Sequence, residues 1–510
     1  MKKNYLVLFL IIGLFSSNNI KSQTVYKDVA PIFYSRCTPC HHENQHGPPM
    51  MTYSETVANS ALMLSDLQTG HMPPWPPDTL YTRFNHEHII STTEKNAIIN
   101  WLNQGALPGD TTLAPAPPTY PQYQLNGTPD LILKTGTFTS NAAANDAYDC
   151  FSIPTNLTQN RILRAFEIVP GNAPIVHHVV IDVDTLGTGT SDLSGTCYNN
   201  SGSFTLGFYV PGSAPTVYPG QAPLKAGVVI KAGSNFRLQI HYPRGTAGQI
   251  DSTQIRLYFY PIGTTGVRPI YTTVPLQNWT MNIAANTTAT YTANYVLPAT
   301  VSLFGTGPHS HKVCTAIKEF AFLGTDTIPL IRINKWDFNW QGFYSYPKML
   351  KIPSGYKILT SHFFDNTVNN LNNPFSPPQN ITAGTSTTNE MLFDGVQYLI
   401  YQPGDDTINV ASLLNNDPLL TVGVNELPLT EVQSYIYPNP ANDLLNIYIS
   451  KKSDYTISIY NITGQLIYKT LTTDDFTTID TKNISEGLYI IQITDSKSNE
   501  KITKKIVLSH

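Results

Sequence analysis

The sequence predicts a multidomain, mainly β chain with one small helical domain near its N-terminus. At 510 residues the chain is too long for a single hydrophobic core, so several domains are expected. Only 13% of residues are charged, whereas Thr, Asn, Pro, Gly and Tyr are plentiful, which is typical of β-rich folds with many turns. The 31 basic and 35 acidic residues nearly balance, so charge does not indicate nucleic-acid binding.

The first 23 residues have the pattern of an export signal. Lys2 and Lys3 form a basic start, and residues 5–15 are apolar. This apolar run is too short for a convincing membrane span, and no other segment has the length and apolarity of one. We therefore expect an exported protein with no membrane span in its mature form.

Residues 24–112 are expected to form the helical domain. The stretch from Thr92 to Leu102 has spaced apolar positions after a capping Ser/Thr start, and Gly105 and Pro108 are stop signals. The proline-rich residues 113–125 are interpreted as a semi-rigid linker.

From residue 126 the pattern changes to short β-type runs such as IVHHVVIDV, FRLQIHYP and QIRLYFYP. No sustained helical periodicity appears, so two jelly-roll-like sandwiches are predicted, over 126–280 and 281–405. A second linker is expected over 406–431. The compact all-β tail, 432–510, should form a small sandwich.

The helical domain contains Cys37-Thr38-Pro39-Cys40-His41, a c-type haem attachment signature. The two thiols would form thioethers to the porphyrin, and His41 would be an axial ligand of the iron. One haem c and a small cytochrome c-like domain are therefore predicted for residues 24–112.

Met72, in GHMPPWPPD, is the predicted second axial ligand, because a thioether opposite an imidazole is the usual cytochrome c arrangement. The alternatives are His71 and the pair Met50 and Met51. The nearby histidines are interpreted as surface residues; they are His86 and His88.

Six residues within the two β domains have the chemistry of a pair of copper sites. Three imidazoles form one set, and two imidazoles with a thioether form the other. On a strand, two histidines two positions apart share a face and can chelate one ion. Adjacent histidines would point to opposite faces, so the pair needs a bulge or a strand end. The candidates are His177, His178 and His241, and then His309, His311 and Met391.

The order HHVV, QIHY, HSH, NEM resembles the copper type II, ascorbate-dependent monooxygenases, which include peptidylglycine α-hydroxylating and dopamine β-monooxygenases. The resemblance covers residues 126–403, and the segments 336–341 (WDFNWQ) and 364–367 (FDNT) resemble bacterial members with unknown substrates. It implies that the first set binds the electron-transfer copper. The second set, His309, His311 and Met391, would be catalytic and bind the copper that meets dioxygen.

Five cysteines are compatible with export. With Cys37 and Cys40 assigned to haem, one disulfide is predicted between Cys150 and Cys197, because both fall in the first copper domain and an oxidising compartment permits it. By the resemblance, they flank the first ligand pair much as a family disulfide does. Cys314 would remain unpaired.

The resemblance implies a copper-dependent monooxygenase that uses two copper ions and dioxygen to hydroxylate a C–H bond of an unknown small organic or peptide substrate. Ascorbate or another reductant would be the electron donor, and the fused haem is a candidate relay. One alternative is a non-catalytic haem and copper electron-transfer or copper-binding surface protein. A zinc hydrolase would need a carboxylate base beside an open metal site, and no such motif appears.

The tail resembles the C-terminal sorting domain of the type IX secretion system of Bacteroidota. The matching pieces are residues 437–441 (YPNPA), 460–465 (YNITGQ) and 487–489 (GLY). The resemblance implies interaction with the type IX secretion machinery and a cell-surface or released product. The alternative is a sugar-binding or spacer sandwich.

Overall fold

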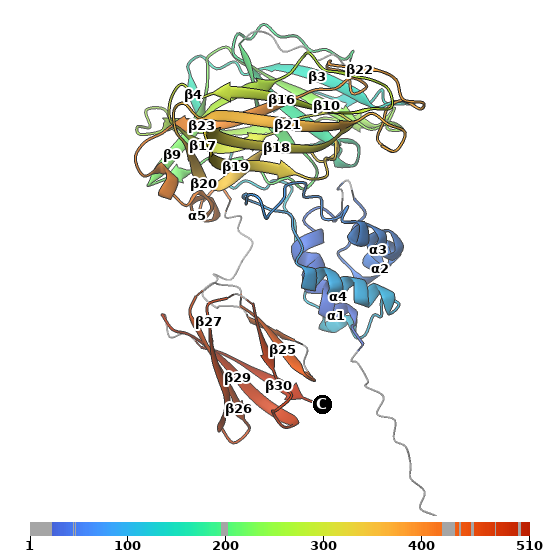
Figure 1. Ribbon diagram of the computed structural model, residues 1–510, viewed down its shortest axis with the longest axis vertical. Coiled ribbons are helices and arrows are strands. Elements are labelled where there is room, and N and C mark those ends of the chain that lie inside the picture. The colour runs from blue at the N-terminus through green and yellow to red at the C-terminus, as the bar shows by residue number, and fades with distance from the viewer. Residues whose placement is uncertain are drawn as a thin grey trace, which may run out of the picture. The chain divides into compact units, whose positions relative to one another are not determined.

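The computed structural model describes residues 23–509, apart from 44, 46, 195–201, 421–433, 438–439, 450–452, 475 and 498–500. The chain divides into two compact units, Met1–Val422 and Gly423–His510 (Figure 1). The export signal expected over 1–23 lies outside the described residues except for its last position. No helix in the described ranges is long and apolar enough to cross a membrane. The chain is mainly β, with several sheets and few helices.

The N-terminal helices pack around Trp101, which is fully buried. Its ring centroid lies 5.8 Å from that of Phe33 and 6.1 Å from that of Tyr26. The predicted capped helix is confirmed: Ser91 and Glu94 form a capping box, each side chain accepting a hydrogen bond from the other's backbone N–H. The elements are α1 (Tyr26–Ile32), the π-helical turn η1 (Phe33–Cys37), α2 (Tyr53–Ala58), α3 (Ser60–Thr69) and α4 (Thr92–Asn103).

The first sandwich has two sheets around a common core. One sheet has the strand order β1 (Leu131–Lys134), β12 (Gln254–Phe259), β4 (Arg161–Val169), β9 (Leu224–Ile230) and β13 (Arg268–Pro269), with β7 (Thr216–Val217) and β8 (Gly220–Gln221) at its side. The other has the order β3 (Ala147–Pro154), β10 (Asn235–Tyr242), β5 (His178–Asp184) and β6 (Ser203–Tyr209). All the described pairs in these two sheets are antiparallel except the parallel pair of β13 with β9. A short pair joins β2 (Phe138–Thr139) to β11 (Ile250–Asp251).

The second sandwich begins at residue 271, earlier than the boundary near 280 expected from the sequence, because β14 pairs with β23. Its first sheet has the order β14 (Tyr271–Gln277), β23 (Phe393–Ile400), β17 (Val301–Gly307) and β20 (Tyr344–Ile352). Its second has the order β16 (Thr288–Val296), β21 (Lys357–Asp365), β18 (Cys314–Leu323) and β19 (Asp326–Ile333). A short pair joins β15 (Asn282–Ile283) to β22 (Ile381–Thr382).

Residues 75–88 leave the helical domain and pack on the second sandwich; we call them the 75–88 strap. Phe84 is buried in the core of that sandwich. Asp78 forms an ion pair with Arg332 at 2.7 Å, and Pro77 forms a β-bridge with Ile333. Part of the segment expected to form the haem domain therefore makes its contacts with the second sandwich instead.

Both expected linkers are packed against the sandwiches where they are described, and the second also forms a β-bridge from Asn409 to Lys348 of the second sandwich. In the first, Leu125 is buried in the core of the first sandwich, and the guanidinium of Arg256 lies 3.7 Å from the ring centroid of Tyr123. In the second, α5 (Val410–Asn415) contributes Val410 and Leu414 to the same core. Burial of these apolar side chains explains why the two segments are held in place.

The second unit is a small sandwich with its own core of isoleucine side chains. One sheet has the order β24 (Ser434–Tyr437), β25 (Leu444–Ile449) and β28 (Phe476–Asp480). The other has the order β27 (Leu466–Thr472), β26 (Tyr455–Asn461), β29 (Gly487–Asp495) and β30 (Lys501–Leu508). This agrees with the all-β tail predicted from the sequence.

Candidate functional site

Strand alternation explains why two histidines that are 63 positions apart meet. His178 on β5 and His241 on β10 are directly opposite each other in the antiparallel register. The flanking Val179, Ile181 and Ile240 belong to the sandwich core. Because successive side chains point to opposite faces of a sheet, both histidines point away from that core.

His177 lies just before β5, which begins at His178. Because His177 is outside the regular strand, its side chain can point to the same side as that of His178, as two adjacent histidines on one metal would require. The His177 N–H donates to the carbonyl oxygen of His241 at 3.0 Å. The Nδ1 atom of His178 lies 3.3 Å from Nδ1 of His177 and 3.3 Å from Nδ1 of His241. Two nitrogens bound at 2.0–2.1 Å to one ion, at a near-tetrahedral angle, would be about 3.3–3.4 Å apart. The three histidines therefore fit one metal ion.

Two further residues orient the His241 ring. The Oδ2 atom of Asp146 lies 3.5 Å from Nε2 of His241, and the ring of Tyr148 stacks on the imidazole at 4.5 Å. The interaction with His241 holds the pKa of Asp146 well below its usual range. A carboxylate at Nε2 favours a proton there, which leaves Nδ1 free to bind a metal. Burial, followed by the neighbouring His241, lowers the pKa of His178 well below its usual value, so that ring is neutral.

The second histidine pair lies outside the strands, in the connection between β17 and β18. The expectation that His309 and His311 share one face of a strand is therefore wrong, because neither residue lies on a strand. Their ring centroids are 5.2 Å apart and the rings are almost perpendicular. Met391 is half-buried just before β23, and the hydroxyl of Ser310 donates to its carbonyl oxygen at 2.6 Å. Strand register and loop contacts thus bring the segments of all three predicted ligands together.

Glu390 fastens these two segments to each other, although the sequence reasoning did not single it out. Its buried carboxylate accepts hydrogen bonds from the backbone N–H groups of His311 at 2.9 Å, Val313 at 2.6 Å and Met391 at 3.2 Å. The only available signal was an acidic residue directly before the methionine, in NEM. A buried carboxylate is tolerated here because several donors satisfy it.

Gln341 and Asn389 determine which ring nitrogen of each histidine is free. The Nε2 atom of Gln341 donates to the carbonyl oxygen of Phe338 at 2.9 Å, which turns its Oε1 atom toward Nδ1 of His309. The carbonyl oxygen of Asn389 lies 3.1 Å from Nδ1 of His311. Both oxygens accept, so both imidazoles carry their proton on Nδ1 and leave Nε2 free for a metal.

Burial keeps both rings in the neutral form that metal binding requires. It lowers the pKa of His309, and it lowers the pKa of His311 to about 3. The first metal site therefore offers Nδ1 atoms and the second offers Nε2 atoms. Soft thioether with imidazole is a donor set suited to Cu(I), so the residues of the second site fit the predicted ion.

The two sites face each other across one aromatic ring. The ring centroid of Phe338 lies 6.3 Å from that of His178 and 5.9 Å from that of His311. Phe338 is only 9% exposed. Its segment is anchored on both sides of the ring, because the indole N–H of Trp336 donates to the carbonyl oxygen of His311 at 3.1 Å and Gln341 contacts His309. In the sequence, the segment 336–341 is distinguished only by its resemblance to bacterial proteins.

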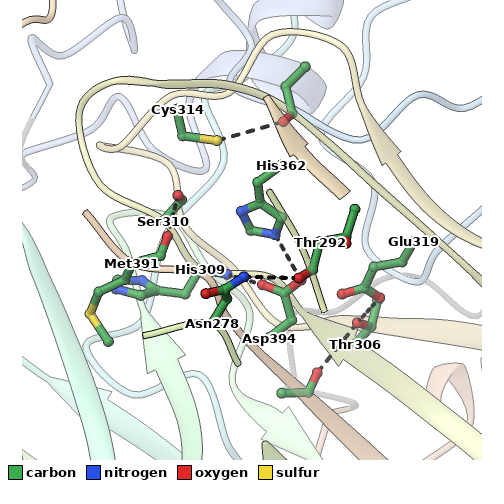
Figure 2. Close-up of polar contacts among 12 residues, drawn as sticks. Asn278, Thr292, Thr306, His309, Ser310, Cys314, Glu319, His362, Met391 and Asp394 are labelled. Atoms are coloured by element: carbon green, nitrogen blue, oxygen red, sulfur yellow. Dashed lines mark hydrogen bonds and ion pairs between the residues drawn. The ribbon is translucent and has the colours of Figure 1, made fainter. Parts of the chain in front are cut away.

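A buried polar network supports His309 from within the second sandwich (Figure 2). Asp394 accepts a hydrogen bond from the His309 N–H at 3.0 Å, and its other carboxylate oxygen lies 2.9 Å from Nε2 of His362. The hydroxyl of Thr306 donates to the Glu319 carboxylate at 2.6 Å. Burial raises the pKa of Glu319 well above its usual value. The network ties the loop of His309 to strands β18, β21 and β23.

The haem attachment motif forms one helical turn. The N–H groups of Cys40 and His41 donate to the carbonyl oxygen of Cys37, at 3.1 and 2.9 Å. Nδ1 of His41 lies 3.0 Å from the carbonyl oxygen of Pro48, so Nδ1 carries the proton and Nε2 would be the axial ligand. Both thiols are free, and burial raises their pKa values, that of Cys37 to about 12. These residues fit a c-type haem.

The four candidates for the second axial position differ in exposure. Met72 and Met51 are half-buried, whereas Met50 is buried in the core of the helical domain. His71 is exposed, 3.3 Å from Asp66. Met72 remains the predicted ligand. Of the two histidines interpreted as surface residues, His86 is exposed, whereas His88 is half-buried.

The cysteines separate into two groups. Cys150 is disulfide-bonded, and its expected partner Cys197 lies outside the described residues. Cys314 is a free, buried thiol on β18. Burial raises its pKa well above the usual value, which makes it an unreactive thiol rather than a nucleophile.

Comparison with known proteins identifies the C-terminal domain. Residues 435–509 match the family of secretion system C-terminal sorting domains. An endo-acting ulvan lyase of Formosa agariphila is 33% identical over 90 residues, which are 18% of this chain and 17% of that enzyme. The matched part is thus a small fraction of the lyase.

Two solved structures are also similar in part. A DUF3244 family protein with an immunoglobulin-like β-sandwich fold from Bacteroides vulgatus is 18% identical, with 15% of this chain and 94% of that chain covered and a TM-score of 0.13. PorZ, a surface component of the type IX secretion system of Porphyromonas gingivalis, is 17% identical, with 25% and 14% covered and a TM-score of 0.15. The C-terminal domain is a type IX secretion sorting domain, and this chain is secreted or located at the cell surface.

Proposed function

We propose that this protein is an exported copper-dependent monooxygenase that hydroxylates a C–H bond of an organic substrate with dioxygen. The observation that carries the proposal is the pair of histidine sets, which contact Phe338 through His178 and His311. In the first set Nδ1 of His178 lies 3.3 Å from Nδ1 of each of the other two histidines, and in the second set fixed acceptors hold the Nδ1 protons and leave Nε2 for a metal. His177, His178 and His241 would hold the electron-transfer copper. His309, His311 and Met391 would hold the copper that meets dioxygen.

The cofactors would supply the redox chemistry. A donor set of two imidazoles and a thioether would favour Cu(I), and the bound copper would supply the oxygen chemistry for the C–H bond. The chain's own residues keep the donors neutral, oriented and shielded from water. Gln341 and Asn389 hold protons on the Nδ1 atoms, and Glu390 and Asp394 hold the two ligand segments in register.

We further propose that Cys37, Cys40 and His41 hold one haem c, with Met72 as the second axial ligand. The haem would pass electrons from ascorbate or another reductant toward the copper sites. The hydroxyl of Thr38, inside the attachment motif, lies 2.6 Å from the hydroxyl of Tyr120, and the ring of Tyr120 stacks on His42 at 4.2 Å. These contacts hold the motif against the segment that enters the first sandwich, which supports a fixed spacing between haem and copper.

A non-catalytic haem and copper electron-transfer protein is the second candidate. The position of Phe338 favours it, because that ring occupies the space between the two histidine sets and leaves less room there for a large substrate. Recognition by the type IX secretion machinery and removal of the sorting domain would be common to both candidates.

Metal analysis with an optical spectrum, followed by oxygen uptake, tests the proposal. We expect two coppers and one haem per chain, and oxygen uptake with reductant that is lost in Met391→Ala. A control variant, Met349→Ala, removes a buried methionine of β20 away from the site and should keep both coppers. Zinc, or no metal, would contradict both candidates. Full metal content without oxygen uptake under any reductant would favour electron transfer.

A further inference from the structure

A cavity lies outside the two predicted metal centres. It has a volume of about 150 Å³, is open on one side, and is lined by the 75–88 strap, the loop after β6 and the chain around Tyr344. None of the six predicted copper ligands lines it, and neither does Phe338. The cavity is therefore separate from the space between the two histidine sets.

Six aromatic side chains contribute to its wall. Trp75 and Tyr344 meet edge to face with ring centroids 5.5 Å apart, and Phe208, Phe304, Trp340 and Phe343 also line it, together with aliphatic and uncharged polar residues. A volume of about 150 Å³ is large enough to hold one benzene ring. The size and lining therefore match a ligand with a single aromatic ring.

One polar group in this wall lacks a partner. Among the described residues, none accepts a hydrogen bond from the indole Nε1–H of Trp75, although this atom is buried. A buried donor without an acceptor is unfavourable, and almost all such groups in folded proteins are satisfied by protein, water or ligand. A ligand in this cavity would satisfy it by presenting an oxygen acceptor.

The wall also determines the charge of the ligand. No Lys, Arg, Asp or Glu side chain lines the cavity in the described part of the chain. Desolvation lowers the pKa of half-buried His88 and also that of His86, although His86 is more exposed, so neither ring supplies a positive charge at pH 7. An anion would lose part of its hydration there without gaining a countercharge, which is unfavourable. The ligand is therefore neutral.

We propose that this cavity binds a neutral, single-ring aromatic molecule that carries an oxygen acceptor, such as a phenol or a quinone. Gln341 forms part of the wall and also contacts Nδ1 of His309, so the bound molecule lies on the side of that imidazole away from its free nitrogen. The site adjoins the second metal centre without opening into it.

Calorimetric titration of the full-length, haem- and copper-loaded protein tests the proposal, with phenol, its isostere toluene, and benzoate as probes. We expect saturable binding of one phenol, about fivefold tighter than toluene because only phenol accepts the Trp75 hydrogen bond. Benzoate should not bind. Tighter binding of toluene, binding of benzoate, or no binding of phenol would overturn the proposal.

Two variants separate the site from other surfaces. Trp75→Phe should weaken phenol binding about fivefold and leave toluene unchanged. The control Trp279→Phe alters an exposed tryptophan whose indole N–H already donates to Gln277, so it should change neither. Ala214→Phe fills the cavity from the half-buried loop after β6 and should abolish binding of both probes. Retained phenol binding in Ala214→Phe would overturn the proposal.

Two further titrations distinguish this inference from the proposed function. Phenol should bind equally to protein from which copper has been removed, so the result does not depend on oxygen chemistry. If phenol binds only to a Cys37→Ala/Cys40→Ala variant that lacks haem, the cavity is a haem contact and the proposal is wrong.

Discussion

His178 and His241 lie directly opposite each other on antiparallel strands, with their Nδ1 atoms 3.3 Å apart. The first metal centre therefore forms only when β5 and β10 pair in this register. A shift of one residue between β5 and β10 would turn one imidazole into the hydrophobic core.

Asp146→Asn should weaken copper binding at the first centre about 10- to 100-fold, because the carboxylate orients His241 through its Nε2 atom. Competition titration with a copper chelator measures the change. Asp66→Asn is the matched control, since Asp66 pairs with the exposed His71 at a similar distance of 3.3 Å. Equal losses in the two variants would contradict an orienting role for Asp146.

Gln341→Leu should weaken copper binding at the second centre about 10-fold or more, because Nδ1 of His309 loses the acceptor that fixes its proton. The affinity of the first centre should not change. Gln341→Glu retains an acceptor oxygen and should restore part of the affinity. Site-resolved electron paramagnetic resonance during the titration separates the two centres, and an unaltered second-site signal would refute the assignment.

Phe338→Ala should lower the free energy of unfolding of the metal-free protein by about 3–5 kcal/mol, the usual cost of removing a buried phenylalanine ring. Phe338 packs against His178 and His311, so both centres should also lose their defined spacing. The control Phe363→Ala changes a residue that is 42% exposed and should have a much smaller effect. Urea denaturation gives the energies, and the dipolar coupling between the two copper ions gives the spacing.

The metal-free protein should lose stability as the pH falls below about 6.5. Burial lowers the pKa of His311 to about 3, so between these values the unfolded chain binds a proton on this residue that the folded chain excludes. Each such histidine removes about 1.4 kcal/mol per pH unit from the free energy of unfolding. The pH dependence of urea denaturation should be shallower by about this amount in His311→Gln, and identical slopes would contradict the buried, neutral state.

A chain truncated after Val422 should remain inside the outer membrane of its host. The first unit is compact by itself, and the sorting domain occupies residues 435–509. Cell fractionation with an antibody against the first sandwich measures the distribution. A control chain with the haem cysteines replaced, Cys37→Ala/Cys40→Ala, keeps the tail and should still be exported. Surface display of the truncated chain would show that another signal suffices.

Local patterns predicted the fold class well, because each depends on residues that are neighbours in the chain. The capped helix that contains Trp101, the alternating runs of the sandwiches and the strands of the tail all follow from short-range periodicity and turn residues. The domain boundary near 280 was placed less well. Whether β14 joins one sandwich or the next depends on its pairing with β23, more than a hundred residues later.

The candidate site divides in the same way. The sequence by itself named the donors, since imidazole, thioether and paired thiols are chemically distinctive wherever they occur. Only the tertiary structure decided how they are used. Glu390, Gln341 and Phe338 act through hydrogen bonds and ring contacts to residues far away in the chain, and no spacing rule connects such partners. Ligand identity is a local property of the sequence, whereas the orientation of each ligand depends on long-range packing.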